Sequence, residues 1–159
     1  MSPEMESKER LAAELEHHGL FSWLDLSVVE MEHGRVMFEV PFDEKFANIS
    51  SGTVHGGVTA TIIDTASGFA LRTTFDSPTE AALTTTDLNT RYVRPATDDV
   101  RVEAEVVRAG KTMGVTDCEV TSVHEGERKV VATGGTTYRL FREASGDRHP
   151  TGANGGDAA

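Results

Sequence analysis

The sequence predicts an α+β domain in which a mostly antiparallel β-sheet curls round one long helix. A helix-like block at about 54–75 lies between two strand-like segments before it and four after it. Hydrophobic residues alternate with polar ones from Val100 to Val106, which is the pattern of a half-buried strand. The chain has 159 residues and 38% hydrophobic content, enough for one compact domain with its own core.

The first third of the chain predicts a short helix and then a hairpin. Residues 4–18 suit an amphipathic helix over a core, with apolar positions at Leu11, Ala12, Leu15 and then Leu20. Two alternating runs then flank His33-Gly34, and Pro41 closes the second. Their apolar positions are Leu24, Leu26 and Val28, followed by Val36, Phe38 and Val40. A loop at 42–52 leads into the long helix.

The rest of the chain predicts four strands, at 82–93, around 100–106, at 113–123 and at 128–141. Pro95 ends the first of them, and turns at Ala109-Gly110 and Glu125-Gly126 separate the others. The expected organisation is an N-terminal helix at 1–19, a main domain at 20–142 and a tail at 143–159. The tail is rich in Gly, Asp, Ala and Asn, so we expect it to be disordered.

Composition excludes several classes of function. Asp and Glu number 26 against 15 Lys and Arg, so a net charge of −11 argues against nucleic acid as a partner. No run of about 18 apolar residues exists, so neither a membrane-spanning helix nor a membrane partner is expected. The charged N-terminus does not look like an export signal. The single cysteine, Cys118, predicts no disulfide framework and a reducing, cytoplasmic location.

The acidic composition has two interpretations. Only four basic residues are lysines, and an acidic, lysine-poor, Thr- and Ala-rich chain is typical of a high-salt cytoplasm, where salt screens self-repulsion. An ordinary soluble acidic protein is the alternative, and the composition leaves both open.

The long helix carries the residues with the clearest chemical potential. One face, formed by Val58, Ile62, Ala66 and Phe69, can pack on the sheet. The opposite stripe contains Gly57, Ala60, Asp64 and Gly68, so a lone carboxylate stands among small residues. A solvated surface Asp is the simpler interpretation, but a solvent-facing stripe normally carries Lys, Glu and Arg. We therefore favour a functional role for Asp64.

The start of this helix is a second candidate. Gly56 and Gly57 leave the first free N–H groups uncovered, where they could polarise a carbonyl or stabilise an oxyanion. The two glycines could equally serve a tight turn into the helix, capped by Gly52 or Thr53.

These residues resemble a known family. His55-Gly56-Gly57 followed by Asp64 is similar to the HGG-x(6)-D signature of the PaaI-type (phenylacetate-pathway-like) hotdog thioesterases. The segment Thr85 to Ala96, with its Arg-Pro-Ala end, and the turn Arg108 to Thr112 resemble the family too, so the likeness covers roughly 20–142. It implies the hotdog fold, hydrolysis of an acyl- or aryl-coenzyme A thioester, and a homodimer or homotetramer with active sites between subunits.

The resemblance also implies a role for each matching residue. The N–H of Gly56 would bind the thioester carbonyl, and Asp64 of the other subunit would act as general base or nucleophile. Asn48 would hold substrate or water, the Thr85 hydroxyl would position the water, and His55 would support the loop. Asn48 lies seven residues before His55, one more than the family pattern, and Ser50 or Ser51 could take its place.

Coenzyme A is part of the substrate in this interpretation, and no cofactor or metal is required. We expect Gly57 and Thr112 to contact the substrate and Arg91, Arg94 and Lys111 to form a basic patch for its phosphates. For the two arginines, scattered surface charges are an equal alternative.

Other signals are weak. The histidines lack HxH or HExxH spacing, so a zinc site is not expected, and no GxSxG elbow suggests an α/β-hydrolase. Nothing near Cys118 marks it as a nucleophile. Two rivals remain: a hydratase, for which the nine-residue spacing of His55 and Asp64 is poor, and an acyl-CoA-binding sensor module without chemistry.

Overall fold

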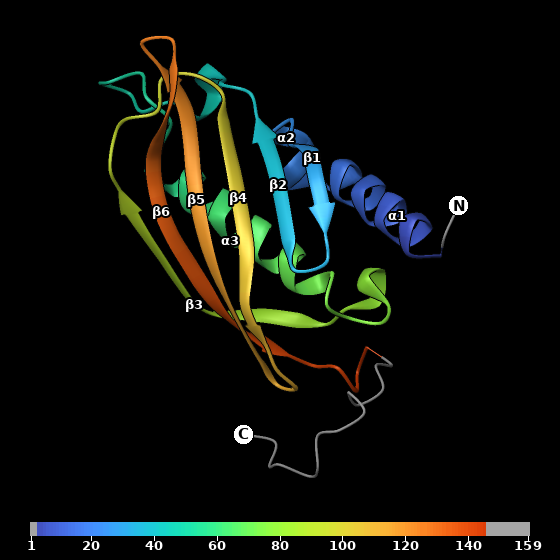
Figure 1. Ribbon diagram of the computed structural model, residues 1–159. Coiled ribbons are helices and arrows are strands. Elements are labelled where there is room, and N and C mark those ends of the chain that lie inside the picture. Colours follow the sequence, from blue (N-terminus) through green and yellow to red (C-terminus); the bar gives the residue numbers. More distant parts are fainter. Residues whose placement is uncertain (1–2, 146–159) are drawn as a thin grey trace.

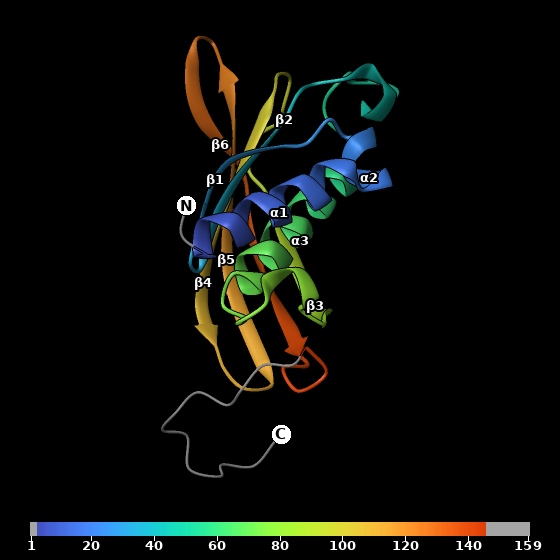
Figure 2. The same ribbon diagram turned by 90° about the vertical axis from the view of Figure 1, so that its right-hand side faces the viewer.

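A computed structural model describes residues 3–145 of the chain. A six-stranded antiparallel sheet curls round one long helix, as the sequence predicts (Figures 1 and 2). The elements in chain order are α1 Pro3–His17, α2 Gly19–Trp23, β1 Ser27–Glu32, β2 Arg35–Val40, the 3-10 turn Glu44–Phe46, α3 Gly56–Arg72, the 3-10 turn Pro78–Glu80, β3 Leu83–Tyr92, β4 Val100–Ala109, β5 Met113–His124 and β6 Glu127–Leu140.

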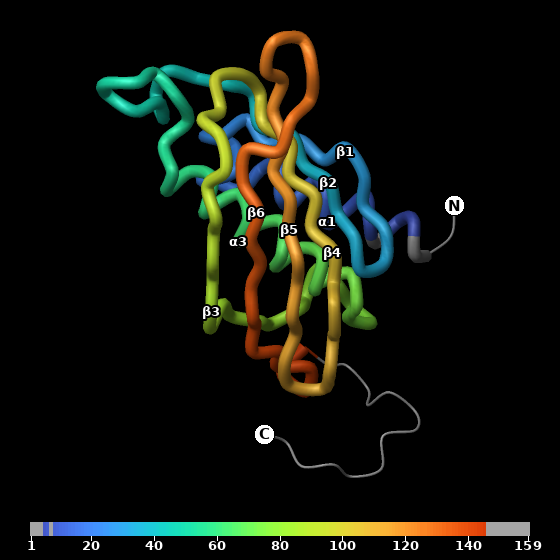
Figure 3. Tube along the Cα trace, turned by 60° about the vertical axis from the view of Figure 1, so that its left-hand side comes forward, coloured from blue at the N-terminus to red at the C-terminus, as the bar shows by residue number. Residues whose placement is uncertain are grey.

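The sheet has the strand order β1-β2-β4-β5-β6-β3 (Figure 3). Strands β4, β5 and β6 form a meander, and the hairpin β1–β2 pairs with its β4 side. Because α3 carries the chain across the sheet, β3 joins the far edge and pairs antiparallel with β6. Strand β3 therefore has one side that no described strand pairs with.

The core lies between α3 and the sheet. Ile62, Ile63, Ala66 and Ala70 of α3 are fully buried, and they pack in one cluster with the inward side chains of the strands. Those side chains include Val36, Phe38, Val102, Ala104 and Val120. Burial of one such isoleucine contributes about 1.5–3 kcal/mol, so this contact fixes which face of α3 remains for the site.

The N-terminal prediction needs two corrections. Leu24 and Leu26 are buried but precede β1, because a short helix, α2, occupies Gly19–Trp23 and Leu24 caps its C-terminal end. Leu20 was expected over the core, but its side chain is 44% exposed. The alternation of Leu24, Leu26 and Val28 therefore comes from a helix end and its turn as much as from a strand.

The C-terminal half agrees closely with the expected strands and turns. The described chain continues past residue 142 to Ser145, which the sequence assigned to the tail. Ser145 is buried, and its hydroxyl accepts a hydrogen bond from the Ala82 N–H at 2.7 Å. These contacts extend the domain through Ser145. The remainder of the predicted tail lies outside the described residues.

Candidate active site

Asp64 stands half-buried in the middle of α3, on the face turned away from the core. Two hydroxyls donate hydrogen bonds to its Oδ1 atom: Thr85 Oγ1 of β3 at 2.8 Å and Tyr138 Oη of β6 at 2.6 Å. Thr85 was named from the sequence and Tyr138 was not. Tyr138 lies 74 positions from Asp64 along the chain, so no local motif could have indicated it.

The Asp64 carboxylate faces a cavity of about 320 Å³. Helix α2 forms part of its wall through Leu20 and Phe21, and the Phe21 ring meets the Phe69 ring edge-on. The other lining residues are Thr61, Thr65, Gly68, Phe69, Arg72, Leu83, Thr84, Thr85 and Tyr138. The exposed Leu20 and the Asp64 carboxylate therefore line the same cavity.

The start of α3 is organised by its cap. His55 is the N-cap residue, and its Nδ1 atom accepts a hydrogen bond from the Gly57 N–H at 2.9 Å. A nitrogen that accepts carries no proton, so the neutral His55 ring bears its hydrogen on Nε2. Over residues 3–145, the Gly56 N–H has no hydrogen-bond acceptor. One free N–H donor is therefore left at the positive end of the helix dipole.

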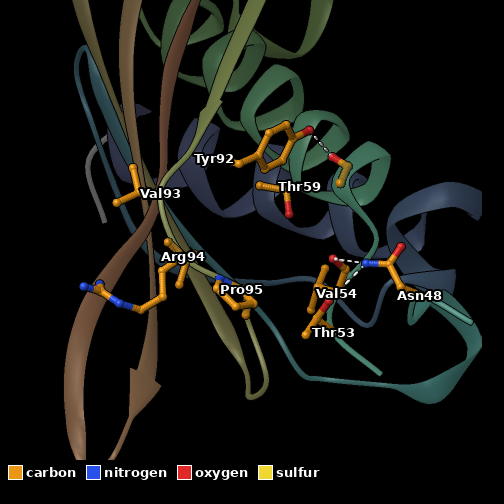
Figure 4. A pocket seen from close by; sticks show the side chains of 11 residues that line it. Asn48, Thr53, Val54, Thr59, Tyr92, Val93, Arg94 and Pro95 are labelled. Atoms are coloured by element: carbon orange, nitrogen blue, oxygen red, sulfur yellow. Dashed lines mark hydrogen bonds between the residues drawn. The ribbon is translucent and has the colours of Figure 1, made fainter. Parts of the chain in front are cut away.

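A second cavity, of about 380 Å³, lies at the start of α3 and is lined in part by Gly56 (Figure 4). The Tyr92 hydroxyl donates to the Gly56 carbonyl, and its ring covers one side of the helix start. Tyr92 was not singled out from the sequence. The remaining lining residues are Asn48, Thr53, Val54, Thr59, Val93, Arg94, Pro95, Ala96 and Val131.

Asn48 lines this second cavity, whereas Ser50 and Ser51 do not. Its amide nitrogen donates to Thr53 Oγ1 at 3.0 Å and to the Val54 carbonyl at 3.4 Å. The loop thus holds the Asn48 amide beside the helix start despite the extra residue in the spacing. Its role in binding substrate or water stays a prediction.

One chain does not bring Gly56 and Asp64 together. They are eight positions apart on one helix, which is about 12 Å at 1.5 Å per residue. They also open into different cavities. A carbonyl bound at the Gly56 N–H is therefore out of reach of the same chain's Asp64.

The expected basic patch is likewise not formed within one chain. Arg91 and Arg94 lie at the end of β3 that pairs near Ala132, whereas Lys111 and Thr112 lie in the β4–β5 turn beside Leu140. Because Leu140 pairs with Leu83 at the start of β3, the two groups occupy opposite ends of that strand. Of these residues only Arg94 lines either cavity, and its guanidinium donates to the Val130 carbonyl at 2.8 Å, away from Asn48 (Figure 4).

The described residues contain no cluster of three His, Cys, Asp or Glu side chains suited to a metal ion. Cys118 is buried against Ser67, and burial raises the pKa of its thiol to about 11. A thiol in that state is a poor nucleophile. Among residues 3–145, no helix is both long and apolar enough to span a membrane.

Comparisons with known proteins show which family the chain belongs to. A family model described as the thioesterase superfamily matches residues 51–129, which include the whole of α3. A "putative esterase" of Halobacterium salinarum is 40% identical over 134 residues, which cover 81% of this chain and 89% of that protein. Human acyl-coenzyme A thioesterase 13 is 33% identical over 72% of this chain and 79% of its own length.

Solved structures agree on the fold. A thioesterase family protein from Silicibacter pomeroyi superposes with a TM-score of 0.78 at 22% identity, covering 86% of this chain and 98% of that one. The E. coli PaaI protein, from the phenylacetic acid degradation operon, gives a TM-score of 0.74 at 20% identity, covering 88% and 96%. With its hotdog fold and these relatives, the chain belongs to the thioesterase superfamily.

Proposed function

We propose that this chain hydrolyses acyl- or aryl-coenzyme A thioesters in an active site formed between two copies of itself. The observation that carries the proposal is the division of the site along α3. Gly56, whose N–H has no acceptor among the described residues, lines one cavity, and Asp64, whose carboxylate is hydrogen-bonded, lines another, and the two residues are about 12 Å apart along α3. A two-fold axis between two α3 helices would place each donor opposite the partner subunit's carboxylate.

Strand β3 supports this pairing, because its free side can extend the sheet into a second copy. Its exposed side chains include apolar ones unusual for a solvent-facing edge strand: Leu88, Tyr92 and the adjoining Val93. A two-fold arrangement is the commonest way for identical chains to bury such an edge, and it generates two equivalent sites per dimer.

The chemistry follows from the two half-sites. The Gly56 N–H polarises the thioester carbonyl and then stabilises the oxyanion of the tetrahedral intermediate. Asp64 of the other copy either takes a proton from the attacking water or attacks the carbonyl itself. The Thr85 hydroxyl donates to Asp64 and keeps an oxygen lone pair that can accept from that water. Coenzyme A leaves as the thiol.

Release of free thiol from a panel of acyl- and aryl-coenzyme A esters, reported by DTNB, tests the reaction. We expect Asp64→Asn to lower turnover by at least about 10³-fold without unfolding the protein, because the attacker loses its base or nucleophile. Asp117→Asn is the matched control, because Asp117 is exposed on β5 and lines neither cavity. An Asp64→Asn variant with wild-type turnover would end the assignment.

The oxyanion donor has its own matched pair of variants. Gly56→Pro removes the N–H at the first helical position, where proline is well tolerated, and His55 already has the extended backbone that precedes proline. Gly56→Ala keeps the N–H but places the same Cβ against the Tyr92 ring, 3.2 Å away. We expect a roughly 10²-fold fall in kcat for Pro relative to Ala, the usual effect of removing one oxyanion donor.

Mixing the two inactive variants tests the shared site. In a dimer of Asp64→Asn and Gly56→Pro chains, one site keeps both functional groups and the other keeps neither. Random reassociation of equal amounts should therefore restore about a quarter of wild-type activity. No recovery from verified mixed dimers would place the whole site within one chain.

The same assay separates a thioesterase from the rival binding module and the rival hydratase, because neither rival releases thiol. A sensor would bind coenzyme A esters and release no thiol, and a hydratase would change the acyl group while leaving the thioester intact.

A further inference from the structure

The carboxylate of Asp64 is held asymmetrically. Tyr138 Oη of β6 and Thr85 Oγ1 of β3 both donate to Oδ1, and these two residues are paired with each other across the two strands. Across residues 3–145, Oδ2 has no hydrogen-bond partner. The two oxygens of one carboxylate are therefore in different states, one fixed and one available.

We propose that Tyr138 is a positioning residue, whose hydroxyl orients the Asp64 carboxylate so that Oδ2 is the oxygen that reacts. This inference rests on the proposed thioesterase function and adds a residue to it. With Thr85 alone, the carboxylate could turn about its terminal bond and keep a single hydrogen bond. With a second donor from β6 on the same oxygen, both donors are satisfied together only in the observed orientation.

Tyr138 is suited to this role because it is buried and hydrogen-bonded to Asp64. Tyr138 is 7% exposed, and its hydroxyl oxygen also lies 2.9 Å from the Asp64 main-chain carbonyl oxygen, so its single hydrogen is shared between that oxygen and Oδ1. Burial, and then the hydrogen bond to Asp64, raise the pKa of the Tyr138 phenol, so it stays a neutral donor at any working pH. The ring is therefore a fixed support for the carboxylate and takes no part in proton transfer.

Gly68 explains how the tyrosine reaches its place. A Cβ atom at position 68 would lie 2.9 Å from the Tyr138 hydroxyl oxygen and 3.3 Å from its Cζ atom. Glycine one turn beyond Asp64 therefore makes room for the phenol. At this position the small-residue stripe of α3 admits a side chain of the same chain, and no ligand is needed to account for it.

Two variants test the proposal in the full-length protein. Tyr138→Phe removes only the hydroxyl, and we expect kcat to fall roughly tenfold to a hundredfold, the loss typical of a hydrogen bond to a charged group. KM should stay within about twofold, because the Tyr138 ring that lines the cavity is kept. Gly68→Ala keeps the hydroxyl but displaces it, and it should lower kcat in the same way.

The cycle of the two substitutions separates positioning from general damage. If Gly68→Ala acts through the Tyr138 hydroxyl, its effect on kcat should largely vanish in the Tyr138→Phe background. Thr136→Val is the matched control, since the Thr136 side chain carries a buried β6 hydroxyl that is hydrogen-bonded to Thr116, and Thr136 does not line the cavity of Asp64. It should keep wild-type kcat even where its unfolding temperature falls as far as that of Tyr138→Phe.

The outcomes distinguish this inference from the function on which it rests. A wild-type enzyme with no thiol release, or an active Asp64→Asn variant, would overturn the proposed function itself. An active wild type, an inactive Asp64→Asn and an unchanged kcat in Tyr138→Phe would overturn only the role of Tyr138. The role of Tyr138 would also be overturned if Tyr138→Phe raised KM without lowering kcat, or if Thr136→Val were as slow as Tyr138→Phe. If Tyr138→Phe does not fold, the kcat of Gly68→Ala tests the role instead: a wild-type value would overturn it.

Discussion

His55 accepts the Gly57 N–H on its Nδ1 atom at 2.9 Å, so the N–H of the intervening Gly56 is the one left free. The same contact fixes the ring in the tautomer with its hydrogen on Nε2. The His55 side chain thus accepts from the Gly57 N–H and leaves the neighbouring Gly56 N–H without an acceptor among the described residues. The histidine of the motif therefore has a structural explanation that needs no proton transfer.

Substitution of His55 tests that explanation. His55→Ala removes the cap acceptor and should lower the free energy of unfolding by about 1 kcal/mol, the usual cost of an N-cap. His55→Asn supplies another good cap acceptor and should recover most of both stability and kcat. Urea unfolding and thiol release measure the two effects. A His55→Asn protein that is stable but as slow as His55→Ala would instead indicate that the imidazole takes part in the chemistry.

The strand and helix pattern could be predicted where side-chain periodicity is strong. Strand β4 and the buried face of α3 follow directly from residues such as Val102 and Ile62. Helix α2 could not be predicted in this way, because five mostly apolar residues are too few to show a helical period. The exposed Leu20 follows from that missed helix.

The candidate site could be predicted where its residues are near one another in sequence, or, as for Thr85, where the family resemblance extends to them. His55, Gly56, Gly57 and Asp64 lie on one helix and its cap, so their spacing carries the information. Tyr138 meets Asp64 through the pairing of β3 with β6, and no spacing shows that pairing. The separation of Arg91 from Lys111 could not be predicted for the same reason. It depends on how β3 pairs with β6, which places the two residues at opposite ends of β3.

Lys111 gives a prediction about the nucleotide part of coenzyme A. If a second copy brings it to the phosphates, Lys111→Ala should raise KM for a coenzyme A ester several-fold, because one charge-assisted contact is lost. KM for the matching acyl-pantetheine thioester, which lacks the nucleotide, should not change, and kcat should be unaffected for both. Initial rates on the two substrates measure the difference.

Lys129→Ala is the control for that measurement. Lys129 is similarly half-buried and lies near Glu127 on β6, outside both cavities. Equal KM values for Lys111→Ala and wild type on the coenzyme A ester would remove Lys111 from the substrate-binding set.

Salt should stabilise the protein. Twenty-six acidic residues against 15 Lys and Arg leave a net charge of −11, and its self-repulsion is screened at about 2 M KCl, where the Debye length is below roughly 3 Å. Salt also weakens ion pairs such as Arg35–Glu103 and Arg101–Glu39. Partly exposed pairs are worth about 0–1 kcal/mol each, so relief of the excess charge should dominate.

Thermal unfolding in low and about 2 M KCl measures this balance, and we expect Tm to rise with salt. Sucrose at matched osmolality controls for exclusion of cosolute from the surface. A Tm that falls as KCl increases would mean that the ion pairs outweigh the excess charge, and the high-salt interpretation of the composition would be wrong.

Cys118 gives a prediction that also bears on any DTNB assay of this protein. Its thiol is buried against Ser67 and Thr116, and burial raises its pKa from the ordinary 9.0 to about 11. At pH 8 the folded protein should therefore show almost no DTNB-reactive thiol, and one per chain should appear in guanidinium. Rapid labelling of the folded protein would contradict the burial of Cys118 and would require a Cys118→Ala background for the thioesterase measurements.

The raised pKa of Cys118 also sets the direction in which the stability of the folded protein depends on pH. A group whose pKa is higher in the folded state favours folding fully below its unfolded pKa and loses that contribution as pH rises through the folded value. For Cys118 the loss should begin near pH 9.0 and be complete near 11. Urea midpoints between pH 8 and 11 should therefore fall more steeply for wild type than for Cys118→Ala. Parallel curves would show that the thiolate forms as easily in the folded protein as in the unfolded chain.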